Sequence, residues 1–251
     1  MIRRMLAAAA LVAALATAAV AYLPPAGAIL RRAAQRRADA FPSPVEARGT
    51  VTFFGEAARQ AAAAARLPLQ GPELASPAVV LLKAPSRCRL ELAPEGVPPP
   101  ERAAVSLKGA RLSGQRGLER TAPARALVEG LCALLGEKGS AEALASELRR
   151  RGVNPSEVSL GRTDHRIAWV LGGRPREPTP QVWVDRQLSQ PTRLIAPLAG
   201  ATRDVRLIGL GTGPGGDAFP QTIEVRSGEQ LELRFTADKV ARNPKMADAL
   251  F

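Results

Sequence analysis

The chain has 251 residues, enough to bury a sizeable core, and carries a formal net charge of +12 at pH 7 with only 4 % aromatic residues. Its basic residues are scattered, mostly arginine, and form no block interleaved with aromatic side chains, so nucleic-acid binding is not expected. The one histidine, His165, excludes a histidine-rich metal site, and the two cysteines lack the CxxC spacing of zinc or redox sites. We therefore expect no metal and no cofactor.

Residues 1–28 have the pattern of a secretory signal peptide. Basic residues within Met1–Met5 precede a nearly unbroken apolar run, 6–23, and Ala26-Gly27-Ala28 offers a small-x-small cleavage site. The pattern predicts cleavage before Ile29 and export to the periplasm. If the run is not removed, its length of about 18 residues is near the lower limit for a membrane anchor.

Helical spacing recurs in three segments after this signal. Residues 29–41 predict a short amphipathic helix that ends before Pro42. Residues 123–136 carry an apolar stripe with a proline at the start and a glycine at the end, and 140–152 begin with a capping-type serine. The alanine-rich segment 57–70 fits either a short helix or a ragged hairpin, and its periodicity does not decide between them.

Strands are predicted wherever apolar and polar residues alternate with a period of two. These segments are 45–56, 77–85, 87–93, one or two within 105–117, 157–160, 166–171 and several within 180–251.

The last third, Pro180 to Phe251, consists of alternating strands with turns between them. Ser227-Gly228 marks a hairpin turn, and Val182 and Val184 alternate with Trp183, where both faces have apolar members and the strand phase is least well determined. The order of elements predicts an α+β fold, a single domain over 29–251 whose antiparallel sheet has an apolar face covered by helices.

Motifs for catalysis are missing from the sequence. His165 follows Asp164 at a strand edge, where a turn role is more typical than catalysis, and no G-x-S-x-G elbow accompanies it. The segment 211–216, GTGPGG, formally fits G-x-G-x-x-G, but Pro214 interrupts it and a strand follows where dinucleotide binding needs a helix. We expect a loop there, no catalytic residue and no enzyme activity.

The chain resembles the LolA/LolB-like superfamily, which includes the periplasmic carrier of outer-membrane lipoproteins. The resemblance runs through GTVTF, VVLLKAPSRCRLEL and PQVWVDRQLSQPTRL, and it is most specific in the C-terminal segment with Asn243-Pro244, Asp248 and Phe251. It implies a strongly curved antiparallel half-barrel with helices over its concave apolar face, which holds acyl chains. One departure concerns the basic residue that the carrier has just before a proline: here Ala84 stands between Lys83 and Pro85.

This resemblance implies a periplasmic carrier for a lipid or an acylated lipoprotein, a monomer that contacts the membrane peripherally or transiently. The alternative is an envelope sensor or scaffold of the same fold that binds a partner protein. The apolar residues expected to line a lipid cavity are Val51, Phe53, Leu90, Leu92, Leu127, Leu131, Ile167, Trp169, Ile223, Val225, Leu231, Leu233 and Phe235.

A disulfide between Cys88 and Cys132 is also predicted. Both cysteines follow the signal segment, so an exported chain would carry them into an oxidising compartment. In the predicted elements Cys88 shares a strand face with Leu90, and Cys132 shares a helix face with Val128 and Leu135. The bridge would join the helix to the sheet; the alternative is two buried free thiols.

Overall fold

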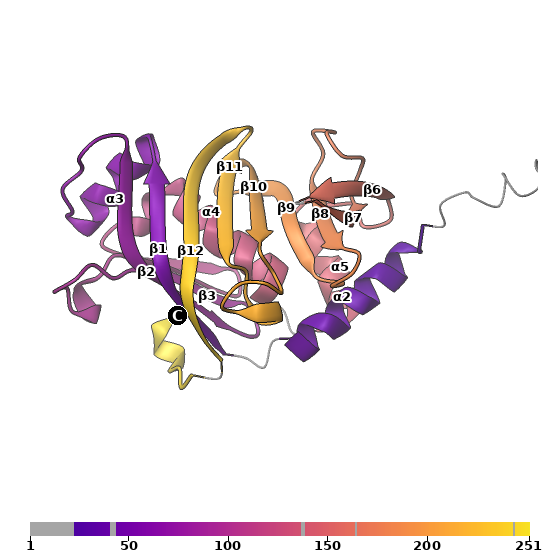
Figure 1. Cartoon of the computed structure of the whole chain (residues 1–251), viewed down its shortest axis with the longest axis horizontal. Coiled ribbons are helices and arrows are strands. Elements are labelled where there is room, and N and C mark those ends of the chain that lie inside the picture. The colour runs from indigo at the N-terminus through magenta and orange to yellow at the C-terminus, as the bar shows by residue number, and fades with distance from the viewer. Residues whose placement is uncertain (1–22, 41–43, 137–138, 164, 243) are drawn as a thin grey trace, which may run out of the picture.

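The computed structural model describes residues 23–40, 44–136, 139–163, 165–242 and 244–251 (Figure 1). Most of the predicted signal segment, together with Asp164 and Asn243, lies outside this range. The described residues form an α+β fold with twelve strands in one antiparallel sheet and four α-helices, labelled α2 to α5.

The sheet is a single open layer in which most neighbours in sequence are also neighbours in space. Its order is β5-β4-β3-β2-β1-β12-β11-β10-β9-β8-β7-β6, so the edge strands β5 and β6 do not pair and the sheet is not closed into a barrel. The strands are β1 Val45–Phe54, β2 Glu73–Lys83, β3 Arg87–Leu92, β4 Ala104–Lys108, β5 Arg111–Gln115, β6 Val158–Thr163, β7 Arg166–Leu171, β8 Gln181–Asp185, β9 Pro191–Leu198, β10 Ala201–Ile208, β11 Thr222–Ser227 and β12 Gln230–Arg242.

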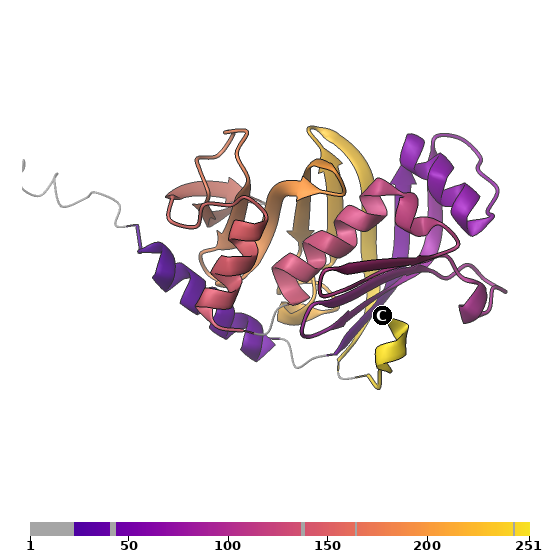
Figure 2. The ribbon, with the colours of Figure 1, turned by 180° about the vertical axis from the view of Figure 1, so that it is seen from behind.

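One helix, α4 (Ala122–Leu131), lies across the sheet and defines its inner face (Figure 2). Because α4 contacts β3 and β4 on one side and β9 to β12 on the other, the sheet must bend around it. The helix α3 (Glu56–Ala65) packs on β1 and β2, whereas α2 (Ala26–Ala40) and α5 (Ala141–Arg150) pack against each other. Burying an apolar helix stripe against an apolar sheet face is the main favourable term in such a layer.

The structure settles one undecided segment as a helix and shifts the boundaries of two predicted helices. The undecided segment 57–70 is helical over α3, which ends at Arg66 in the left-handed conformation. The predicted helix 123–136 is α-helical only to Leu131, and Cys132–Gly136 continue as a π-helical turn. The helix α2 begins at Ala26, within the predicted cleavage site, and the side chain of Ile29 is buried.

No helix among the residues that the structure describes is long and apolar enough to cross a membrane. Cleavage before Ile29 stays a prediction.

The strand phase around Trp183 is the one that the period of two predicts. Val182 and Val184 belong to the core on the inner face, and Trp183 packs on the outer face with Ala168 and Val170 in a small second cluster. The guanidinium carbon of Arg193 lies 4.7 Å from the centroid of the Trp183 ring, so a cation–π contact covers this apolar cluster.

The outer face of the central strands carries a network of arginines around two buried carboxylates. Asp204 accepts two hydrogen bonds of 2.8 Å from Arg193, and Glu224 accepts hydrogen bonds of 2.9 Å from Arg226 and 2.8 Å from Arg234. The bonds from Arg193 to Asp204 and from Arg234 to Glu224 run between diagonal or directly opposed residues of neighbouring strands, and such pairs stabilise a sheet. The bond from Arg226 to Glu224 lies within β11. The network accounts for part of the arginine excess as structural.

Replacing Glu224 by glutamine is expected to lower the free energy of unfolding by about 2 kcal/mol at pH 7, because two charge-assisted hydrogen bonds are weakened. Burial acts to raise the pKa of Glu224, but the hydrogen bonds and charges of Arg234 and Arg226 outweigh it, and the pKa lies below its usual value of 4.5. Since the folded pKa is the lower one, the carboxylate stabilises the fold above its usual pKa, and this contribution is lost as the pH falls through the lowered value.

Urea unfolding at pH 7 and at pH values below 4.5 measures this effect, and the difference between Glu224→Gln and the unsubstituted protein should shrink towards zero in acid. Glu229→Gln, in the exposed β11–β12 turn, is the control and should change stability by less than about 0.5 kcal/mol. A difference for Glu224→Gln that does not depend on pH would contradict the role assigned to the carboxylate.

Candidate functional site

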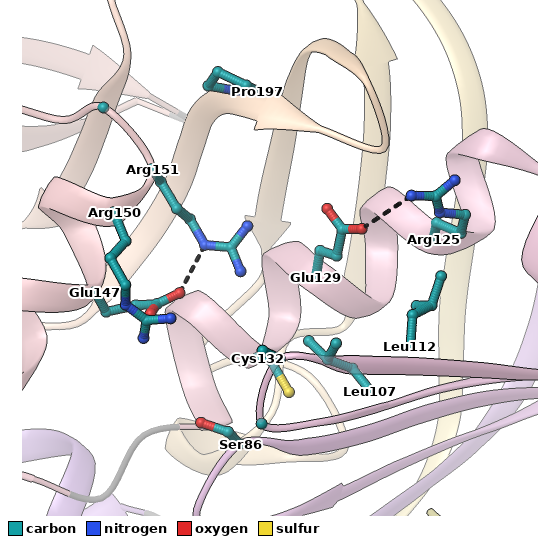
Figure 3. Close-up of a pocket in the computed structure, with 13 residues that line it drawn as sticks. Ser86, Leu107, Leu112, Arg125, Glu129, Cys132, Glu147, Arg150, Arg151 and Pro197 are labelled. Carbon is teal, nitrogen blue, oxygen red and sulfur yellow. Dashed lines mark hydrogen bonds and ion pairs between the residues drawn. The ribbon is translucent and has the colours of Figure 1, made fainter.

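A pocket of about 710 Å³ opens where α4, α5, the β4–β5 hairpin and β9 meet (Figure 3). Volumes of this size are typical of small-molecule sites. The helices contribute charged side chains, and the hairpin and β9 contribute apolar ones. The lining residues are Ser86, Leu107, Gly109, Ala110, Leu112, Arg125, Glu129, Cys132, Glu147, Arg150, Arg151, Gly152 and Pro197.

A disulfide holds the inner edge of this pocket together. Cys88 on β3 and Cys132 at the end of α4 are bridged, with their Cα atoms 5.8 Å apart, which confirms the predicted pairing. The π-helical turn that follows also contacts the sheet, since the Ser86 N–H donates to the carbonyl oxygen of Gly136 at 2.9 Å. The end of α4 is therefore attached to the β2–β3 turn by one covalent and one hydrogen bond.

The charges in the pocket form two groups on the two helices. On α4, Arg125 lies 3.8 Å from Glu129, whose other carboxylate oxygen accepts a hydrogen bond of 3.1 Å from the Ala199 N–H. On α5, the nearly buried Glu147 accepts a hydrogen bond of 2.8 Å from Arg151. Figure 3 shows both pairs facing the space between the helices.

The α5 carboxylate is shared, because Glu147 also pairs with Arg150. The pocket thus contains three guanidinium groups and two carboxylates, a net charge of +1. In addition, the Nε of Arg125 is buried without a hydrogen-bond partner among the described residues. An unsatisfied buried donor is costly, so an acceptor group that reached it would be bound favourably.

Apolar residues also line the pocket. Figure 3 shows Leu107 and Leu112 of the hairpin as an apolar wall on one side of the charged groups, and Pro197 of β9 on the other side. This arrangement suits a molecule with an anionic or polar group at one end and hydrocarbon at the other.

Residues with catalytic or metal-binding potential are placed elsewhere. His165 is exposed in the β6–β7 turn with φ 63°, the turn position that the sequence predicts. The GTGPGG segment forms a loop that leads into the strand β11, also as predicted. Among the residues described, no group of three or more His, Cys, Asp or Glu side chains is arranged to hold a metal ion.

Most of the residues predicted to line a lipid cavity lie together in one hydrophobic core, where they pack against one another and do not line the 710 Å³ pocket. Ligand binding by them remains a prediction. The buried members are Val51, Phe53, Leu90, Leu92, Leu127, Leu131, Trp169, Ile223, Val225, Leu233 and Phe235.

Two predicted members depart from this arrangement. Ile167 is 42 % exposed, because it lies next to the β6–β7 turn at the edge of the sheet, where only β6 follows. Leu231 is only half-buried, because a β-bulge shifts the register of β12: Leu233 opposes the core residue Val225, but Leu231 opposes Arg226 of the outer face. Simple alternation does not predict a bulge, and the bulge reverses the face of the residues beyond it.

The charged lining of the pocket was not predicted from the sequence. None of the charged residues of α4 and α5 is among the predicted site residues. A usable signal was present, because Arg125/Glu129 and Glu147/Arg151 are both oppositely charged i,i+4 pairs that mark one helix face each. The sequence does not indicate that these two helix faces meet in the folded protein.

Comparison with known proteins gives similarities of structure only. No family model matches the chain, and no curated protein does. A LolA superfamily protein from Nitrosomonas europaea is similar at 14 % identity and a TM-score of 0.47, covering 91 % of this chain and 98 % of the other.

A DUF1329 family protein from Desulfovibrio piger is similar at 9 % identity and a TM-score of 0.39, covering 91 % of this chain and 98 % of the other. MucB in complex with the periplasmic part of MucA matches at 16 % identity and a TM-score of 0.28, covering 90 % of this chain and 58 % of the MucB chain. At these identities and TM-scores the likeness is one of structure alone, and no conclusion about function follows from it.

Proposed function

We propose that this protein is an exported carrier that binds an amphiphile, an acyl chain with an anionic or polar headgroup, as a free lipid or as part of an acylated lipoprotein. The observation that carries the proposal is the pocket in which the guanidinium groups of Arg125, Arg150 and Arg151 face an apolar wall. The headgroup lies among the guanidinium groups, and the acyl chain extends beneath α4 into the concave face of the half-barrel.

The energetics of such a ligand are favourable. Each buried methylene contributes about 0.8 kcal/mol, so a long acyl chain supplies most of the binding free energy. Guanidinium groups bind carboxylate and phosphate oxygens through paired hydrogen bonds, which adds orientation to affinity. For the chain to enter, α4 must separate from the inner face, and the disulfide at Cys132 restricts this movement to the helix end opposite the bridge.

The site of action that we infer is the periplasm. A disulfide persists in an oxidising compartment, and the Cys88–Cys132 bridge agrees with the export that residues 1–28 predict.

A displacement titration tests the proposal with two fluorescent probes, a long-chain fatty acid and its uncharged ester. Arg125→Ala and Arg150→Ala should each weaken binding of the fatty acid about tenfold, a loss of about 1.4 kcal/mol, and should leave the ester almost unaffected. Arg149→Ala is the matched control: it removes the same charge from the neighbouring, exposed position of α5, outside the 710 Å³ pocket.

The acyl chain is tested separately with Leu131→Glu, which places a carboxylate beneath α4 and should abolish binding of both probes if the variant still folds. Folding is checked by its circular dichroism, and mass spectrometry of lipid that co-purifies with the native protein identifies the cargo. If delipidated, folded protein binds neither probe, the carrier proposal fails.

The alternative proposal is an envelope sensor or scaffold that binds a partner protein. It is supported by the tight packing of the predicted cavity residues, which leaves the core beneath α4 filled by its own side chains. Absence of probe binding favours this alternative.

A further inference from the structure

Four neighbouring strands place a basic residue at the same register on the outer face, beside the pocket. Lys83 on β2 is directly opposite Arg87 on β3, Arg87 is opposite Lys108 on β4, and Lys108 is opposite Arg111 on β5. We call Lys83, Arg87, Lys108 and Arg111 the basic row. Directly opposed residues share a face of the sheet, so the four side chains leave the same surface side by side.

Like charges directly opposite each other destabilise a sheet, and three such pairs in succession need compensation. Elsewhere on the outer face the arginines alternate with carboxylates, but here the only carboxylate is Asp248 of the C-terminal segment, 2.6 Å from Lys83 Nζ and 3.5 Å from Arg87. Among the described residues, no carboxylate lies within 4.0 Å of Lys108 or Arg111, and both side chains are exposed. Four cations share one anion.

The positive charges of the basic row act on the carboxylate of Asp248. The pKa of Asp248 is lowered chiefly by the hydrogen bond from Lys83, against a smaller effect of burial, and the charges of Arg87, Lys83 and Lys108 lower it further. The carboxylate is thus held ionised, and the row retains a net excess of positive charge.

The position of the row relates it to the pocket. Two turns connect its members: Ser86 lies in the turn between Lys83 and Arg87, and Gly109–Ala110 lie between Lys108 and Arg111. These turn residues, at the ends of the strands, also line the 710 Å³ pocket, whose hairpin residues Leu107 and Leu112 lie on the inner face. A surface that contacts the basic row therefore lies on the outer face, next to the turns that border the pocket.

An exposed apolar side chain accompanies the row. The C-terminal turn Asp248–Leu250 lies beside β2 and β3 (Figure 1), and Arg89 donates a hydrogen bond of 3.1 Å to the Leu250 carbonyl oxygen. The side chain of Leu250 is 40 % exposed. Surfaces that bind at an anionic membrane interface combine clustered cations with neighbouring exposed apolar residues.

We propose that the basic row docks on the anionic headgroups of a membrane leaflet, with Leu250 entering the interface, so that the turns that border the pocket lie close to the lipid. This inference rests on the proposed carrier function. A protein partner fits the surface less well, because a protein interface has an apolar centre and the row offers one exposed leucine, whereas mobile lipid headgroups neutralise a row of cations without shape complementarity.

The test is co-sedimentation of the protein, as recovered from the envelope fraction, with vesicles of phosphatidylcholine containing 30 % phosphatidylglycerol, and with vesicles of phosphatidylcholine alone, about 30 % being an ordinary anionic content. Binding should require the anionic lipid and decrease strongly between about 0.05 and 0.5 M salt. Lys108→Ser with Arg111→Ser should weaken binding about 25-fold, about fivefold for each cation.

The matched control is Arg162→Ser with Arg174→Ser, which removes two exposed arginines near the opposite edge of the sheet and should change binding less than about twofold. Exchanging the row residues as Lys108→Arg with Arg111→Lys keeps the charge and should keep the affinity. Asp248→Asn removes the one carboxylate from the row and should strengthen binding, an effect of opposite sign that a purely structural role does not produce.

No binding to the anionic vesicles, or an equal loss in the control pair, would overturn the proposal, and so would retention of binding by the row variant. Binding of the row to an acidic protein with none to vesicles would do the same. The fatty-acid titration tests the carrier function independently. If the protein binds no fatty acid but its vesicle binding depends on the basic row, the carrier function is contradicted and membrane docking is supported. If it binds the fatty acid but not the vesicles, only membrane docking is contradicted.

Discussion

Replacing Cys88 and Cys132 by serine is expected to lower the free energy of unfolding by about 4 kcal/mol. The bridge closes a loop of 44 positions, and the entropy that it removes from the unfolded chain corresponds to that amount in the chain-entropy model. Both cysteines are buried in the core, so the substitution also places two hydroxyl groups there, which adds to the loss. A loss of this size is a large part of the total free energy of unfolding of a single domain.

Urea unfolding of the oxidised protein, the reduced protein and the double serine variant measures this effect. Reduction of the unsubstituted protein removes the bridge without adding hydroxyl groups, so it separates the two contributions to the loss of stability. The control is the same protein after reduction and re-oxidation. Reaction of both thiols with maleimide in the unfolded, unreduced protein would show that the bridge is absent. Fatty-acid binding should also weaken on reduction, because Cys132 lines the pocket and its bridge positions the end of α4.

The second large effect concerns β12, where two leucines separated by a β-bulge differ in burial. Leu233 is fully buried in the core beneath α4, and Leu231, two residues earlier, is only half-buried near the hairpin tip. Leu233→Ala is expected to cost about 3 kcal/mol, from lost transfer free energy and the cavity that remains, whereas Leu231→Ala should cost about 1 kcal/mol.

The comparison is matched in chemistry and strand, so strand propensity and the unfolded chain contribute almost equally to both variants, while the two side chains lie on different faces of the sheet. Urea unfolding of the two variants side by side gives the difference. Equal losses would contradict the difference in burial between the two residues.

The alternation of apolar and polar residues was enough to predict most strands and their faces. Val182 and Val184 face the core, and Cys88, Leu90 and Leu92 do so together, because a side chain in a strand has only two directions and only one of them leads away from water. The disulfide followed from the same reasoning, since a cysteine on the inner face of β3 and one on the apolar stripe of α4 must meet if the helix covers the sheet.

Long-range placement was beyond what periodicity predicts. Within 57–70 the chain is helical where it packs on β1 and β2. Alanine favours a helix and does not favour strand pairing, which was the alternative for this segment. The pocket arises because Arg125 and Glu129 on α4 meet Glu147 and Arg151 on α5, and the sequence contains each pair but not the angle between the helices.

The class of fold, most inward faces of the strands and the pairing of the two cysteines are predictable from the sequence, because they depend on local periodicity and on the exclusion of apolar surface from water. The exposure of Ile167, the bulge that turns Leu231 outward and the alignment of the basic row are visible only in the folded molecule. Such alignment depends on the register between strands, which turn geometry and packing set together and which no single segment encodes.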